Sequence, residues 1–251
     1  MDHSKKLNII IAFVFAVLVG VSLVDPVAQD LEYHSFSDQG MYWNIPNTWD
    51  VLSNVPFVIV GVFGLVVLAR AKAFDVPGTY RTVSRLFFVG LVLTGLGSGY
   101  YHLAPSNETL VWDRLPMTLS FMAFFSFVLS IHISERLGRC LLWPLVAVGI
   151  SSVLYWAYTE SVSAGDLRFY AVVQFLPMIL IPSIVMMFPA ARYRAVYIWG
   201  VIAVYIVAKF GEHFDYQIHD LLGVSGHSLK HMVAALSGIA FLYALKSIRA
   251  V

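Results

Sequence analysis

The chain has 251 residues, of which 59% are hydrophobic and 12% are charged, and its mean hydropathy is +0.76. Soluble domains contain roughly 45–50% apolar residues, so this composition excludes an ordinary soluble protein and favours helices that face lipid. The net charge of +1 does not indicate nucleic-acid binding, and the single cysteine, Cys140, excludes an internal disulfide and a paired-cysteine metal site.

Apolar stretches recur along the chain, each close to the roughly 20 residues that a transmembrane helix needs. The first follows Lys5 and Lys6 and has no cleavage site after Val24, so we interpret it as a retained anchor helix rather than a signal peptide. The stretches lie at residues 7–26, 51–70, 83–104, 115–133, 140–158, 167–188, 195–211 and 228–247. The sequence therefore predicts an all-α, polytopic transmembrane helix bundle.

The links between these stretches differ in their content of Lys and Arg. The two termini and the links on their side carry twelve basic residues, whereas the opposite side carries only Arg114, Arg168, Lys209 and Lys230. Because basic residues resist translocation, we expect both termini to be cytoplasmic. The short links suit a bacterial inner membrane. Acidic residues gather on the outer side, so we expect polar chemistry near the outer face.

Three of the predicted helices carry polar side chains near their outer ends. Ser98 and His102 are four residues apart at the end of the third stretch, Asp113 opens the fourth, and His227 and His231 are four apart at the start of the last. Ionisable groups within a span cost at least ~2.5–3.5 kcal/mol each, so they indicate a function by default. Residues four apart share one helix face, which allows two imidazoles to bind one ion.

Three imidazoles with one open position are typical of a catalytic zinc site, where bound water has a pKa of about 7 and acts as a nucleophile. We assign the metal to His102, His227 and His231. Asp113 is expected to accept the proton of the water as a general base, and Ser98 to stabilise the developing oxyanion. Each histidine taken singly is explained equally well by interfacial hydrogen bonding, but five such residues at one depth favour a site.

The segments around these residues resemble the motifs of alkaline ceramidases, which belong to a superfamily of seven-helix membrane hydrolases that includes adiponectin-receptor-like proteins. GSGYYH at 97–102 is similar to the family's G-S-x-x-x-H motif, WDRLPM at 112–117 to D-x-L-P-M, and GHSLKH at 226–231 to H-x-x-x-H. NTWDVLSN at 47–54 is similar to the start of the family's first core helix. The resemblance runs from about residue 38 to residue 247 in matching order.

The resemblance implies zinc-dependent hydrolysis of ceramide, or a similar N-acyl sphingolipid drawn from the bilayer, to a sphingoid base and a fatty acid. It implies a seven-helix core at residues 31–251, with residues 1–30 forming an additional N-terminal anchor helix and outer segment. By similarity, the three histidines bind zinc while Asp113 and Ser98 assist hydrolysis. The family's acidic calcium site gains little support here, because Asp38, Asn44 and Asn47 occupy that region and Asn47 stands where the family has Glu.

Two other functions stay open, namely a receptor or sensor with a structural zinc site, and a metal or proton transporter. A transporter needs polar residues through to the cytoplasmic side, and apart from Gln174 the helix interiors offer few. The sequence does not specify the acyl chain, the headgroup or the oligomeric state.

Some other polar residues are interpreted structurally. We interpret Asp50 and Asn54 as a hydrogen-bond network, and His34 and His132 as interface residues. A second polar cluster is interpreted as an outer loop or helix mouth that is solvated or steers substrate, rather than as metal ligands, and comprises Glu212, His213, Asp215, His219 and Asp220.

Overall fold

The structure is a computed structural model that describes residues 1–70, 78–190 and 193–248. Helices dominate these residues, and their only strands are β1 (Met41–Tyr42) and β2 (Ile45–Pro46), which pair antiparallel. The long helices are α1 (His3–Ser22), α3 (Val55–Ala69), α4 (Gly78–Leu103), α5 (Asn107–His132), α6 (Glu135–Ser161), α7 (Arg168–Met187), α8 (Val196–His213) and α10 (Gly226–Lys246). The short helices are η1 (Leu31–His34), α2 (Thr48–Leu52) and α9 (Asp215–Leu222).

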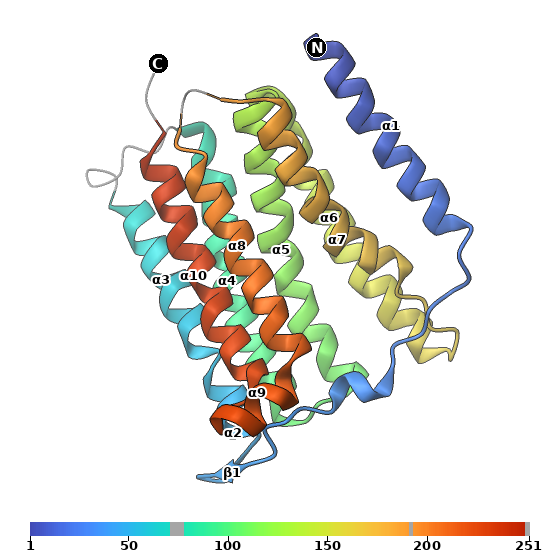
Figure 1. Ribbon diagram of the computed structural model, residues 1–251, viewed down its shortest axis with the longest axis vertical. Coiled ribbons are helices and arrows are strands. Elements are labelled where there is room, and N and C mark those ends of the chain that lie inside the picture. Colours follow the sequence, from blue (N-terminus) through green and yellow to red (C-terminus); the bar gives the residue numbers. More distant parts are fainter. Residues whose placement is uncertain (71–77, 191–192, 249–251) are drawn as a thin grey trace.

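Among the described residues, eight helical segments are long and apolar enough to cross a membrane, with α2 and α3 together forming one of them. The predicted all-α, polytopic bundle is therefore confirmed, with seven core segments and the additional helix α1. Figure 1 shows the two chain termini at one end of the bundle and β1, α2 and α9 at the other, as an even number of crossings requires. α1 diverges from the bundle and packs on α7 (Figure 1). The domain division at residue 30 stays a prediction.

The start of α5 differs from the predicted boundary, because the helix begins at Asn107 rather than at residue 115. The Ser106 side chain accepts a hydrogen bond from the backbone of Thr109, whose hydroxyl pairs with the Ser106 backbone in return. This capping box satisfies two backbone donors and stabilises a polar first turn that hydropathy alone does not reveal. Asp113 consequently lies in the second turn of a regular helix and does not open it.

Gly97 sets the close approach of α4 and α5. A Cβ atom at this position would lie 1.9 Å from the backbone oxygen of Trp112, so only glycine fits without moving a helix. This contact places the last turns of α4, with Ser98 and His102, beside the first turns of α5. The glycine-rich segment at 95–99 therefore allows the close helix packing that its sequence suggests.

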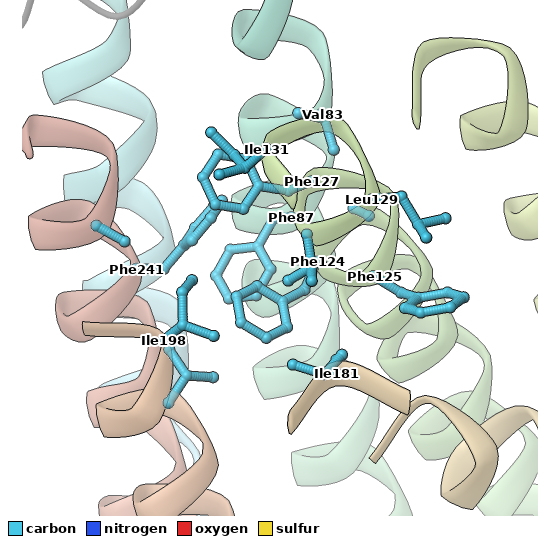
Figure 2. Packing of buried hydrophobic residues seen from close by; sticks show 14 of the residues in the cluster. Val83, Phe87, Phe124, Phe125, Phe127, Leu129, Ile131, Ile181, Ile198 and Phe241 are labelled. Atoms are coloured by element: carbon cyan, nitrogen blue, oxygen red, sulfur yellow. The ribbon is translucent and has the colours of Figure 1, made fainter. Parts of the chain in front are cut away.

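Buried phenylalanines fill the centre of the bundle deeper in the membrane (Figure 2). The ring of Phe241 on α10 lies 4.5 Å from that of Phe87 on α4 and 4.9 Å from that of Phe127 on α5, measured between centroids. Phe241 follows His227 by 14 residues on the same helix, which corresponds to about 21 Å along its axis. The aromatic cluster thus lies between the polar end of the bundle and the end that carries the termini.

Candidate metal centre

The three predicted histidine ligands lie together at the end of the bundle that carries α2 and α9. His102 comes from the last turn of α4, and His227 and His231 come from the first two turns of α10. Their ring centroids are 4.7 to 5.0 Å apart, and none of the three side chains is more than 3% exposed. Each offers a ring nitrogen within 4.8 Å of the others, and no second such group of metal-ligating side chains occurs in the described ranges. The three histidines can therefore hold one metal ion.

The hydrogen bonding of the trio supports a metal ligand set. Neither ring nitrogen of His102 has a hydrogen-bond partner within the described part of the chain, although the side chain is buried. An unsatisfied buried imidazole is costly, and coordination of a metal would satisfy it. His231 is oriented by Ser53, whose Oγ lies 2.8 Å from its Nδ1, as is common for the outer partners of metal-binding histidines. Nitrogen ligands of this kind fit zinc.

Asp215 fixes the start of the helix that carries two of the histidines. Its carboxylate accepts hydrogen bonds from the backbone of His227 at 2.9 Å and from the hydroxyl of Ser225 at 2.9 Å. It also accepts from the backbone and hydroxyl of Ser37, so it joins the segment before β1 to α10. The interpretation of Asp215 as a solvated loop residue was wrong, because the first turn of α10 supplies buried donors that satisfy the carboxylate.

Asp50 on α2 forms the second half of this network, as its interpretation as a structural residue predicted. Its Oδ1 accepts hydrogen bonds from Ser225 at 2.9 Å and from Ser228 at 2.6 Å. Asn54 donates its side-chain amide to the backbone oxygen of Asp50 at 2.8 Å. Two carboxylates thus meet the N-terminal turn of α10, where the helix dipole favours negative charge.

Replacing Asp215 by alanine is expected to destabilise the protein and weaken metal binding together, because four hydrogen bonds are lost and the His227 backbone is released. We expect a loss of about 2–4 kcal/mol in unfolding free energy and a metal affinity at least about tenfold lower. Thermal unfolding and metal titration of the purified protein measure the two effects. Asp220→Ala on the same short helix α9 is the control, since Asp220 is exposed, and an equal loss in both variants would contradict this role.

Ser98 and Asp113 lie close to the trio and line one cavity with His231. Both side chains are buried, and the Ser98 hydroxyl interacts with the Asp113 carboxylate. The cavity walls come from α4, α5, α7, α8 and α10, and toward the bundle centre they are apolar, with Phe87 and Phe124 among their residues. Of the five residues selected from the sequence, Ser98, Asp113 and His231 therefore line the cavity, and the rings of His102 and His227 lie against that of His231.

Further charged residues line this cavity that sequence analysis did not assign to a site. The carboxylate of Glu212 accepts a hydrogen bond from the amine of Lys209 at 2.6 Å and lies 3.6 Å from the amine of Lys230. Glu212 lies near the end of α8 in the cavity lining, so it is a helix-mouth residue that both lysines neutralise and not part of a solvated loop. The spacing of Lys209 and Glu212, three apart on one helix face, was the available signal. Tyr33 of η1 also lines the cavity, and burial raises the pKa of its phenol, so the group stays neutral.

Two histidines that were interpreted as interface residues form hydrogen bonds within the protein. His34 lies 2.8 Å from both the hydroxyl of Tyr101 and the side-chain oxygen of Asn107. His132 is buried, with Nδ1 2.5 Å from the backbone oxygen of Phe188 and its other nitrogen hydrogen-bonded to the hydroxyl of Tyr193. Their partners lie more than 50 residues away in sequence, which explains why no local pattern revealed them.

The region that corresponds to the family's calcium site is occupied by structural hydrogen bonds. The Asp38 carboxylate accepts from the backbone of Gly40 and of the first turn of α2, at 2.8 to 3.1 Å. Asn47 donates its amide to the backbone oxygen of His102 at 2.9 Å. Through Asn47, this segment therefore braces the end of α4 that carries His102.

A protein-family model described as Ceramidase matches residues 41–215. The matched range includes Ser98, His102 and Asp113 and ends before His227 and His231. A search of curated proteins found no match.

Proposed function

Because the chain belongs to the ceramidase family, we propose that it hydrolyses ceramide, or a similar N-acyl sphingolipid, with a zinc ion held by His102, His227 and His231. The products are a sphingoid base and a fatty acid. The observation that carries this proposal is the convergence of three buried imidazoles, of which His102 has no side-chain partner among the described residues and His231 lines an apolar cavity.

The chemistry divides between the metal and two side chains of the cavity. A bound zinc ion would lower the pKa of a water ligand to about 7 and polarise an amide carbonyl. Asp113 acts as the general base that takes a proton from the attacking water and returns it to the leaving amine. Ser98, which interacts with the Asp113 carboxylate, donates to the oxygen of the amide as negative charge develops there.

The lipid is proposed to enter from the bilayer between α7 and α8. Both helices line the cavity, but they pack on different neighbours, α7 on α5 and α6 and α8 on α10. Gln174 and Met178 of α7 face the cavity with Tyr205 of α8. We further propose that the protein lies in a bacterial inner membrane, which its short links suit. Both termini are then cytoplasmic and the metal centre lies near the outer face, as the distribution of Lys and Arg favours.

The centre of the bundle favours an enzyme over a transporter. A transporter would need a polar path from the histidines to the opposite end. The buried aromatic cluster around Phe87, Phe127 and Phe241 occupies that route (Figure 2). Substrate and products therefore enter and leave on the same side.

Purified protein with zinc is expected to release fatty acid from short-chain and long-chain ceramides, as measured by chromatography of the products. Stripping the metal with a chelator is expected to abolish this release, and added zinc to restore it, because no other described cluster can replace the trio. Absence of release from every ceramide would refute amide hydrolysis. Equal release before and after metal removal would refute the role of zinc.

A further inference from the structure

Arg114 on α5 is a buried cation with an unused donor. Its guanidinium carbon lies 4.3 Å from the ring centroid of Trp156, 4.7 Å from that of Tyr170 and 5.5 Å from that of Tyr33. One terminal nitrogen, Nη2, donates to the side chain of Gln29 at 2.7 Å. The other, Nη1, has no hydrogen-bond partner among residues 1–70, 78–190 and 193–248. Within the same residues Arg114 forms no ion pair.

This environment leaves the charge of Arg114 only partly compensated. The residue is 6% exposed, so water cannot solvate it freely, and a guanidinium stays protonated at any physiological pH. Surrounding aromatic rings offset part of the cost of burial through cation–π interactions. They supply no acceptor for Nη1, however, and a guanidinium with a free donor is well suited to bind a carboxylate, phosphate or sulfonate.

The charges of the cavity agree with a missing anion. Apart from histidine, the charged residues that line it are three cations and two carboxylates, namely Arg114, Lys209, Lys230, Asp113 and Glu212. Positive charges therefore exceed negative charges by one. Glu212 already interacts with both lysines and does not offset Arg114. A headgroup with hydroxyls alone would leave this excess charge without a partner.

We propose that Arg114 forms an anion subsite in the cavity, and that the preferred substrate is an amide lipid whose headgroup carries an oxyanion such as a phosphate. This inference rests on the proposed function, because it specifies the substrate of the same cavity. The acyl chain occupies the apolar part of the cavity, and the amide lies beside His231. The oxyanion accepts a hydrogen bond from Nη1 of Arg114.

The test measures binding without turnover, using two lipid analogues in which a ketone replaces the amide. They differ only in the headgroup, which is neutral in one and a phosphate monoester in the other. Wild-type protein with its metal is expected to bind the phosphorylated analogue roughly tenfold more tightly, as one charge-assisted hydrogen bond allows. Arg114→Gln is expected to bring the affinity ratio to about one, and Arg114→Lys to retain part of it.

Arg168→Gln is the control, since it removes a positive charge at the same end of the bundle but outside this cavity. The ratio should persist in this variant, and inorganic phosphate in tenfold excess should not displace the phosphorylated analogue. Equal affinity of the wild type for both analogues would overturn the inference, as would an equal loss in Arg168→Gln or displacement by inorganic phosphate. If Arg114→Gln does not fold, the affinity ratio of the two analogues in the wild type and in Arg114→Lys tests the inference. Absence of hydrolysis would count against the proposed function alone.

Discussion

Alanine at any one of His102, His227 and His231 is expected to abolish both zinc binding and ceramide hydrolysis. Three protein ligands leave no redundancy in a tetrahedral site that keeps one position for water. A catalytic metal contributes several kcal/mol to transition-state stabilisation, and each 1.36 kcal/mol corresponds to a tenfold change in rate. We therefore expect activity to fall by at least about 1,000-fold. Metal analysis should find about one zinc per chain in the wild type and much less in each variant.

His102→Ala is the most informative of the three variants. The His102 side chain makes no hydrogen bond within the described residues, so its truncation breaks none, whereas His231→Ala also breaks the contact with Ser53. The metal-free stability of His102→Ala should therefore stay close to that of the metal-free wild type. His213→Ala, an exposed histidine at the end of α8, is the control and should retain zinc and activity. Zinc content in His102→Ala equal to that of the wild type would refute the site.

The helices and the grouping of the three histidines were predictable because both depend on local patterns. Runs of about 20 apolar residues reveal membrane helices, and pairs such as His227 and His231 share a face wherever the helix lies. The ends of successive spans alternate between the two sides of a membrane. That alternation brings the end of α4 next to the start of α5 and of α10, where Gly97 permits close approach.

The remaining polar residues could not be assigned because their partners are remote in sequence. Asp50 meets Ser225 and Ser228 across more than 170 residues, and this pairing turns two carboxylates near α10 into buried structural groups. Arg114 illustrates the same limit, since its surroundings come from three separate regions of the chain. A count of basic residues treats it as an outer-side charge, although it lies inside the bundle. Charge distribution predicts the side of the membrane and does not predict burial.

Asp113→Asn is expected to lower the rate of hydrolysis by about 100- to 10,000-fold, the usual contribution of a general base, while zinc binding persists. The side chain lines the cavity beside Ser98 and is absent from the histidine group, so an isosteric amide removes the proton acceptor without removing a ligand. The loss should appear in kcat, because the variant still binds the lipid but cannot take the proton in the transition state.

Glu108→Gln supplies the matched control for this prediction, since Glu108 is an exposed acid in the first turn of the same helix. It should retain wild-type kcat and zinc content, because it lies outside the cavity. Steady-state kinetics and metal analysis on the same preparations separate the two roles open to Asp113. Loss of zinc in Asp113→Asn would show that Asp113 helps to hold the metal. An unchanged kcat with zinc retained would show that another group accepts the proton. A general base predicts only the third combination, in which zinc is retained and kcat falls.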